Sequence, residues 1–260
     1  MIREHTIRPQ ERSKRPLQKL VSVIIPALNE EKLLANTLTL FTPEMKQRFN
    51  MEVIVSDGGS TDATIGIAMA YADGIATHEE QRRQTIAEGR NRGAAMAHGD
   101  ILMFLNADSV IPYTTDFLEH ATARMLNDSS LVALAVKVQI APQERNWKDR
   151  LFHGFFNRYI QILNTFGIGM GRGECQIVRK SAFEAIGGYN AALPAAEDYD
   201  LYRRLRSVGK IAFDSQLLIY ESPRRYRKYG YAKVYLEWTK NALSVMAKNR
   251  AASQVWEEVR

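Results

Sequence analysis

The sequence predicts an α/β fold: a mostly parallel central sheet flanked by helices, with a small antiparallel part in its second half. Strand-like apolar runs alternate with helical segments before residue 108, which is typical of a parallel sheet covered by helices. The run over 101–105 is apolar at five consecutive positions, which indicates a strand buried on both faces. A chain of 260 residues with 45% hydrophobic content can bury a sizeable core, and one domain is expected.

The first half of the chain carries the clearer pattern. Asn29 is expected to cap a helix that has acids in its first turn. The glycine-rich turn over 57–62 is expected to lead into a second helix that ends near residue 71. A third helix is predicted over 81–97, where Gly99 follows its end. The predicted strands of this half cover 20–26, 52–56, 74–77 and 101–105.

The second half is predicted to be less regular. The segment 131–141 alternates in the manner of an exposed or edge strand, and 173–179 predicts another strand. A helix is expected over 197–208, followed by further short strands within 210–220. A last helix contains Trp238.

The two ends of the chain differ from the middle. Residues 1–19 are basic and without periodicity, and they are predicted to form a flexible tail; 223–260 are predicted to form a basic and aromatic helical extension. No apolar run follows the basic residues of the tail, so no signal peptide is expected, and no window is long enough to span a bilayer. One cysteine, Cys175, excludes an internal disulfide and suits a cytoplasmic location.

The net charge of +6 favours anionic partners such as phosphates, lipid headgroups or nucleic acid. Two common ligand-binding motifs are missing. No Gly-x-Gly-x-x-Gly loop follows the first strand and no P-loop lysine is present, which disfavours hydride transfer and P-loop chemistry.

Two carboxylates follow predicted strands. Asp108 comes just after the apolar run 101–105, at the edge of the sheet where ligands bind in open α/β folds. A hard carboxylate there is suited to hold Mg²⁺ or Mn²⁺ against nucleotide phosphates. Asp57 ends a strand and begins a glycine-rich turn, where it could reach a base or ribose. The alternative for both is a plain capped turn.

Charged residues elsewhere are also candidates. The side chain of Arg90 could pair with a phosphate or a base edge, although an arginine on a solvated helix face is commoner. Glu197 and Asp198 open a helix, where acids favour the macrodipole, but a carboxylate there could also serve as a general base. Arg224 and Arg225 could bind phosphate or simply be solvated.

Four segments stand in the order and spacing of one known family. They are VSVIIPALNEE (21–31), EVIVSDGGSTDAT (52–64), GRNRGAAMAHGDILMFLNADS (89–109), and RKSAFEAIGGYN with EDYDLYRRL (within 179–205). The chain resembles the family 2 glycosyltransferases over roughly 20–210. The resemblance implies a GT-A catalytic domain over 20–222, with a nucleotide-binding half (20–110) and an acceptor half (111–222). It also implies inverting transfer of a sugar from a nucleotide donor to an acceptor hydroxyl.

The resemblance assigns residues to the nucleotide site. Asp57 matches the acid that contacts the nucleotide base, and Arg90 matches the basic residue beside the nucleotide. The first-strand segment that lines this site corresponds here to Pro26, Ala27, Asn29 and Glu30.

The resemblance also assigns the metal and the base. Asn106, Ala107 and Asp108 match the Asp-x-Asp metal motif, and Asp198 of the Glu197–Asp198 pair matches the catalytic base. Asn106 departs from the motif because its amide carries no charge. The resemblance therefore implies Mg²⁺ or Mn²⁺ held chiefly by Asp108, with a weaker metal dependence than is usual.

Several partners stay open on sequence alone. The donor could be a UDP-, GDP- or dTDP-sugar, and the acceptor a saccharide or a lipid-linked hydroxyl. A sugar-nucleotide nucleotidyltransferase is one alternative, although no basic phosphate loop follows the first strand. A basic module that binds nucleic acid or membrane is another, but the acids at 57, 108 and 198 would repel nucleic acid, which is not expected as a partner.

The segment 147–166 permits two interpretations. It could be an amphipathic segment that lies on the inner face of a membrane, with Arg150 and Arg158 near headgroups and Trp238 adding to the surface. It could equally be a buried helix and a homodimer contact.

Overall fold

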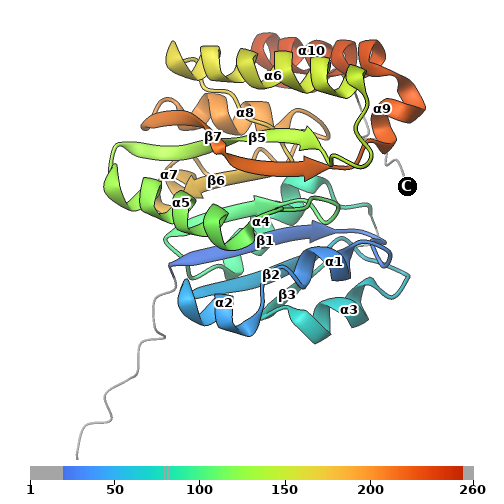
Figure 1. Ribbon diagram of the computed structural model, residues 1–260, viewed down its shortest axis with the longest axis vertical. Helices are drawn as coiled ribbons and strands as arrows, with labels where there is room; N and C mark the ends of the chain where they lie inside the picture. Colours follow the sequence, from blue (N-terminus) through green and yellow to red (C-terminus); the bar gives the residue numbers. More distant parts are fainter. Residues whose placement is uncertain (1–19, 79, 81, 254–260) are drawn as a thin grey trace, which may run out of the picture.

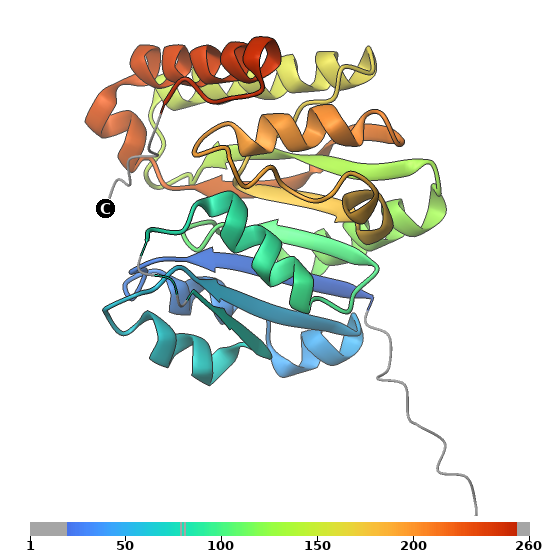
Figure 2. The same ribbon diagram turned by 180° about the vertical axis from the view of Figure 1, so that it is seen from behind.

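The protein forms a seven-stranded mixed sheet with helices on both faces, in a computed structural model that describes residues 20–78, 80 and 82–253 (Figures 1 and 2). The predicted α/β fold with a mostly parallel sheet is confirmed. The predicted tail over 1–19 and the last residues of the C-terminal extension lie outside the described residues. The strands follow the order β3-β2-β1-β4-β6-β5-β7.

Within this sheet β6 runs against both of its neighbours, whereas the other pairings are parallel. The start of β6 therefore lies at the same edge as the carboxyl ends of β1, β2 and β4. This reversal brings the segment before Cys175 next to the residues that follow Leu105, and Asn106 donates its backbone N–H to the carbonyl of Glu174 (3.1 Å). The strands are β1 Val21–Ala27, β2 Met51–Asp57, β3 Gly74–Thr77, β4 Ile101–Leu105, β5 Leu131–Ile140, β6 Cys175–Arg179 and β7 Lys210–Glu221.

The helices divide between the two faces of the sheet. Apolar side chains of α1, α3 and α5 join one core cluster with alternate residues of the strands, and α4, α6, α7 and α8 contribute to the cluster on the opposite face. The helices are α1 Leu34–Leu38, α2 Pro43–Arg48, α3 Thr64–Tyr71, α4 Ile86–Met96, α5 Thr114–Asn127, α6 Trp147–Thr165, α7 Lys180–Ala185, α8 Glu197–Leu205, α9 Arg224–Tyr229 and α10 Tyr231–Lys248.

Three sequence predictions need correction. The segment predicted as an exposed or edge strand is β5, which is buried and pairs with β6 and β7, because helices cover both of its faces. The expected short strands after residue 210 are one strand, β7, at the edge of the sheet. The helix predicted from residue 81 begins at Ile86, where Thr85 and Glu88 form a capping box.

Asn29 also differs from its predicted role as a helix cap. Its φ of 52° places it in the left-handed region, and the next helix begins only at Leu34. Its side-chain oxygen accepts the backbone N–H of Thr61 (2.8 Å), and its own N–H donates to the hydroxyl of Ser60 (2.8 Å). Asn29 therefore ties the loop after β1 to the turn after β2.

Helices α6 and α10 lie side by side as an outer layer beyond β5 and β7 (Figures 1 and 2). Their facing sides are aromatic: Phe156 contacts Trp238 and Tyr235 at ring-centroid distances of 5.6 and 6.4 Å. No helix in the described part of the chain is long and apolar enough to cross a bilayer.

Candidate active site

A pocket of about 480 Å³ opens at the carboxyl ends of β1, β2 and β4. The loops after these strands form one wall. The loop before β6, the start of α8 and the end of β7 form the other, because the reversal of β6 brings them to the same edge. The predicted site residues that line the pocket are Pro26, Ala27, Glu30, Arg90, Asn106, Ala107, Asp108, Glu197, Asp198, Arg224 and Arg225.

Asp57 lies beside this pocket at the end of β2, with a buried side chain. One carboxylate oxygen, Oδ2, accepts the backbone N–H groups of Gly59 (2.9 Å) and Ser60 (3.0 Å). The other, Oδ1, is buried without a hydrogen-bond partner among the described residues. A buried acceptor without a partner is costly, so this oxygen is suited to receive an N–H donor from a ligand.

Arg90 joins the two walls of the pocket. Its guanidinium is fully buried and donates to Glu197 (2.8 Å), to the side-chain oxygen of Asn106 (3.0 Å) and to the carbonyl of Gly173 (2.7 Å). The ring of Tyr189 lies 5.3 Å from the guanidinium carbon. Arg90 therefore lies in the pocket wall with Nη1 and Nη2 committed to the protein, whereas its Nε is buried without a hydrogen-bond partner among the described residues. The side-chain oxygen of Asn106 is likewise engaged, by Arg90.

Asp198 follows directly on this buried ion pair. The preceding Ala196 has a φ of 59°, a left-handed conformation that is uncommon for alanine and that sets the direction in which α8 starts. Removal from water and the neighbouring Glu197 carboxylate together raise the pKa of Asp198 to about 7. Such a carboxyl can accept a proton near neutral pH.

Asp108 is the acid predicted to hold a metal. It follows β4, its side chain is partly exposed, and its Oδ2 accepts a hydrogen bond from the guanidinium of Arg224 (3.2 Å). Within the described residues no group of three His, Cys, Asp or Glu side chains could hold a metal ion. Asp108 is thus the acid of the motif that is open to a cation, and a site built on it needs oxygen ligands from a bound substrate. Mg²⁺ is often held in this way, by one or two carboxylates and substrate phosphates.

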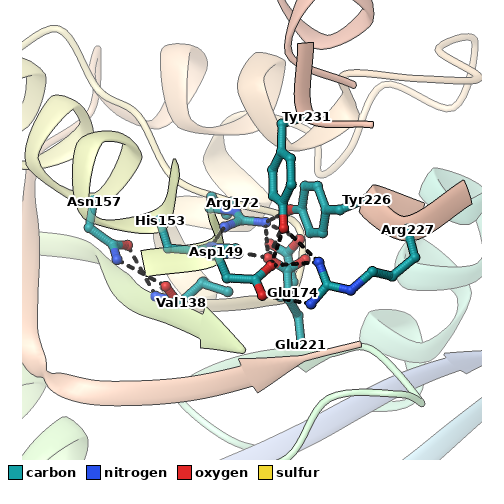
Figure 3. Close-up of polar contacts among 10 residues, drawn as sticks. All are labelled: Val138, Asp149, His153, Asn157, Arg172, Glu174, Glu221, Tyr226, Arg227 and Tyr231. Atoms are coloured by element: carbon teal, nitrogen blue, oxygen red, sulfur yellow. Dashed lines mark hydrogen bonds and ion pairs between the residues drawn. The ribbon is translucent and has the colours of Figure 1, made fainter. Parts of the chain in front are cut away.

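A second charged cluster was missed by the sequence analysis (Figure 3). Arg172 is buried and donates to Glu174 (2.8 Å), Glu221 (2.6 Å) and the hydroxyl of Tyr226 (3.1 Å). Burial opposes ionisation of both carboxyls; the pKa of Glu174 is nevertheless lowered, by Arg172, whereas that of Glu221 is raised well above its usual range. Glu221 is therefore the partner that retains a proton. The glycine-rich run directly before residue 174 is the sequence feature that could have indicated a closely packed site at the start of β6.

The aromatic wall of the pocket comes from helices α6 and α10. Phe156 and Trp238 line the pocket, and the guanidinium of Arg172 lies 5.6 and 5.2 Å from their ring centres. Trp238 was considered part of an outer surface, but it packs inward against Phe152 and Phe156. Burial lowers the pKa of Arg225, which also lines the pocket.

A family model described as glycosyl transferase family 2 matches residues 22–187. The chain belongs to glycosyl transferase family 2. A validoxylamine A glucosyltransferase of Streptomyces hygroscopicus subsp. limoneus is 36% identical over 90 residues, which cover 34% of this chain and 20% of that protein. A beta-monoglucosyldiacylglycerol synthase of Nostoc is 24% identical over 259 residues, which cover 91% of this chain and 53% of that protein. The family 2 chain thus spans between a fifth and about half of these relatives.

Solved structures show the same fold. A mannosyltransferase of Pyrobaculum calidifontis, in complex with GDP-Man and Mn²⁺, has a TM-score of 0.65 at 20% identity, covering 88% of this family 2 chain and 66% of that one. Glucosyl-3-phosphoglycerate synthase of Mycobacterium tuberculosis, with Mn²⁺ and UDP, has a TM-score of 0.58 at 17% identity, covering 88% and 78%. The predicted GT-A fold is thereby confirmed.

Proposed function

We propose that this family 2 chain transfers a sugar from a nucleoside diphosphate donor to an acceptor hydroxyl, with inversion at the anomeric carbon and Asp198 as the general base. One observation carries the proposal. The Asp198 carboxyl lines the same pocket as Asp108 and has a pKa of about 7, which suits a group that must accept a proton near neutral pH. Family membership supports the reaction class.

The acceptor hydroxyl gives its proton to Asp198 while its oxygen bonds to the anomeric carbon. The bond between that carbon and the diphosphate oxygen breaks, and its electron pair leaves with the nucleoside diphosphate. Because the oxygen attacks on the face opposite the departing group, the configuration inverts. Arg90 does not touch the reacting atoms in this scheme; it holds Glu197 and Asn106 and thereby positions Asp198 and the loop after β4.

The donor half uses the ends of β1 and β2. The unpartnered Oδ1 of Asp57 accepts an N–H of the nucleotide base, and Arg224 and Arg225 approach the phosphates from the opposite wall. Two similar proteins were solved with GDP-Man and with UDP-GlcNAc, so a screen for this chain includes UDP-, GDP- and dTDP-sugars.

A divalent cation fits the donor half through Asp108. Mg²⁺ or Mn²⁺ would be held by its carboxylate and by diphosphate oxygens, and would neutralise charge on the leaving group. Asn106 adds no charge and its side-chain oxygen is engaged by Arg90, so Asp108 supplies the ionic contact from this motif.

The acceptor side of the pocket is lined by Phe156, Met170 and Trp238. Aromatic faces of this kind suit the apolar face of a sugar ring or an apolar group that carries the hydroxyl. The acceptor is therefore a saccharide or a lipid-linked hydroxyl.

Replacement of Asp198 by Asn tests the base. With a panel of UDP-glucose, GDP-mannose and dTDP-glucose in Mn²⁺, release of nucleoside diphosphate is expected to fall by about 10²–10⁴-fold, the usual contribution of a general base. Donor affinity by calorimetry is expected to stay unchanged. The wild-type rate should rise with pH as Asp198 loses its proton near pH 7, and level off above it.

Asp116→Asn, on the exposed side of α5, removes the same charge at a residue that does not line the pocket and serves as the control. A D198N protein that turns over donor at the wild-type rate would show that Asp198 is not the base. Failure of the wild-type protein to bind any of the nucleotide sugars would contradict the proposed function as a whole.

A further inference from the structure

Helix α6 is apolar on two opposite faces. Its inner face contains buried residues such as Phe156 and Ile160, which pack against the sheet. Its outer face carries exposed apolar side chains spaced three or four residues apart over the length of the helix, so they form a single stripe. These are Trp147, Leu151, Phe155, Tyr159, Ile162 and Phe166.

Helix α10 repeats this arrangement beside it. Val234, Asn241 and Val245 form its buried face, and the exposed Leu236 and Leu243 lie on the opposite one. The exposed Tyr235 and Met246 lie on the flank between these faces, where Tyr235 contacts Phe156 of α6. The two helices are neighbours in the outer layer (Figures 1 and 2), so their stripes together form a broad apolar surface. We call this surface the α6–α10 face. Apolar surface of this extent marks an interaction site on a soluble domain.

Basic residues surround the α6–α10 face. Residues 228–250 contain five Lys or Arg and one Glu, and 147–165 contain three Lys or Arg and one Asp, whereas Arg224 and Arg225 belong to the pocket. That single acid of α6, Asp149, is buried and paired with Arg227 and Tyr231 (Figure 3). The two segments therefore hold a net +6, equal to that of the whole chain, so the charges of all remaining residues cancel.

We propose that the α6–α10 face docks on an anionic lipid bilayer, with the apolar stripes in the interfacial region and the surrounding Lys and Arg side chains among the headgroups. Such a face could be covered by a second copy of this chain or by a lipid bilayer, and its positive charge favours the bilayer. A second copy of this chain would bring two strongly cationic surfaces together, which is unfavourable, whereas an anionic bilayer complements both the charge and the apolar stripes. The proposal goes beyond sugar transfer and does not depend on it.

Vesicle flotation tests the proposal with the full chain. Vesicles of phosphatidylcholine alone are compared with vesicles of equal parts phosphatidylcholine and phosphatidylglycerol. The wild-type protein is expected to float with the anionic vesicles and to stay in solution with the neutral ones. Leu151→Ser combined with Leu236→Ser should weaken binding by more than about tenfold, because each removes a side chain that is buried in the interface.

Matched control variants distinguish binding through the α6–α10 face from non-specific binding to vesicles. Leu126→Ser on α5 removes a leucine of similar exposure (60%, against 68% for Leu151) on another element, and should bind as the wild type. Lys240→Glu on α10 should reduce binding at least about fivefold, since each basic residue near the surface contributes about 1 kcal/mol. Lys32→Glu is the corresponding control in the loop after β1.

Two results would overturn the proposal. One is wild-type protein that remains wholly in the soluble fraction with anionic vesicles, or that binds them no better than the L151S/L236S protein. The other is a concentration-dependent dimer in sedimentation that the same two substitutions convert to a monomer, which would assign the α6–α10 face to a second copy of this chain.

Discussion

The carboxyl of Asp198 is held in surroundings that favour its protonated form. Its pKa in the folded chain is about 7, against an ordinary value of 3.8, so the folded state keeps a proton that the unfolded state has released between these limits. Stability is therefore lost as the pH rises from about 4 to 7, and the deficit persists at higher pH. The group proposed as the base works against the stability of the fold.

Asp198→Asn should consequently stabilise the protein, and more so at pH 8 than at pH 5. The expected gain in Tm at pH 8 is roughly 2–4 °C or more, the size that about 1 kcal/mol produces in a chain of this length. Thermal denaturation of both proteins at the two pH values measures it. Equal Tm values of the two proteins at pH 8 would show that the folded state tolerates the charge of the Asp198 carboxylate. The D116N control should show no pH-dependent gain in Tm.

At the residue scale, the sequence allowed candidate site residues to be chosen among the acids that lie at the ends of predicted strands and helices. Asp57, Asp108 and Asp198 could be chosen because they follow strands or open a helix, and two of these lie in the pocket while Asp57 lies beside it. Partners far apart in the sequence could not be predicted. Arg172 meets Glu221 only because β6 and β7 bring them together at one edge of the sheet.

At the element scale, helix α4 is held close to the sheet by a glycine. A Cβ atom on Gly93 would lie 2.5 Å from a methyl carbon of Ile24 on β1, well inside ordinary contact. The same helix carries Arg90, whose buried hydrogen bonds depend on this spacing. Gly93 therefore sets how deeply Arg90 reaches into the pocket wall.

Gly93→Ala should destabilise the protein although alanine favours a helix. Overpacking against Ile24 is expected to outweigh the gain in helix propensity and lower the free energy of unfolding by about 1–2 kcal/mol. Gly154→Ala, inside α6, is the control: open space surrounds its added methyl group, and stability should rise by about 0.5–1 kcal/mol. Urea denaturation of the two variants measures both changes, and stabilisation by G93A would contradict the close packing.

Elements were predictable where the local pattern and the tertiary environment agree. The uniformly apolar β4 is buried as its composition indicates. Leu131–Ile140 has polar residues only near its end, at Lys137 and Gln139, and its interior position in the sheet depends on the α5 and α6 helices that cover it. No helix was predicted over 114–127, so the helical cover of β5 by α5 was not expected from the sequence.

At the scale of the whole molecule, the pocket is assembled from the two halves of the chain. Asp108 comes from the end of the first half, and Arg224 from a helix that begins 116 residues later, yet they are 3.2 Å apart. Both side chains are about one-third exposed, and an ion pair of this kind contributes little to stability. The ion pair between Asp108 and Arg224 can therefore break at little cost when Arg224 binds a diphosphate and Asp108 binds a cation.

Asp108→Asn should remove the dependence of donor binding on Mn²⁺ while leaving the fold intact. In wild-type protein we expect Mn²⁺ to tighten the binding of the preferred nucleoside diphosphate by at least about tenfold, because a cation held by the Asp108 carboxylate would attract the diphosphate oxygens. In the D108N protein the affinity should be equal with and without the metal. Arg224→Met should weaken binding under both conditions, since it removes a phosphate contact without touching the cation. Calorimetric titrations with UDP, GDP and dTDP, each with and without MnCl₂, measure these effects.

Lys210→Met is the matched control for the last prediction. It breaks another exposed ion pair of the same length, with Asp128 at 3.2 Å, between two residues that do not line the pocket. Its nucleotide affinity should equal that of the wild type in every titration. Mn²⁺ that still tightens binding to D108N would place the cation on other oxygens. A wild-type affinity unaffected by Mn²⁺ would instead indicate that Arg224 and Arg225 neutralise the diphosphate without a metal, a role that their position in the opposite wall permits.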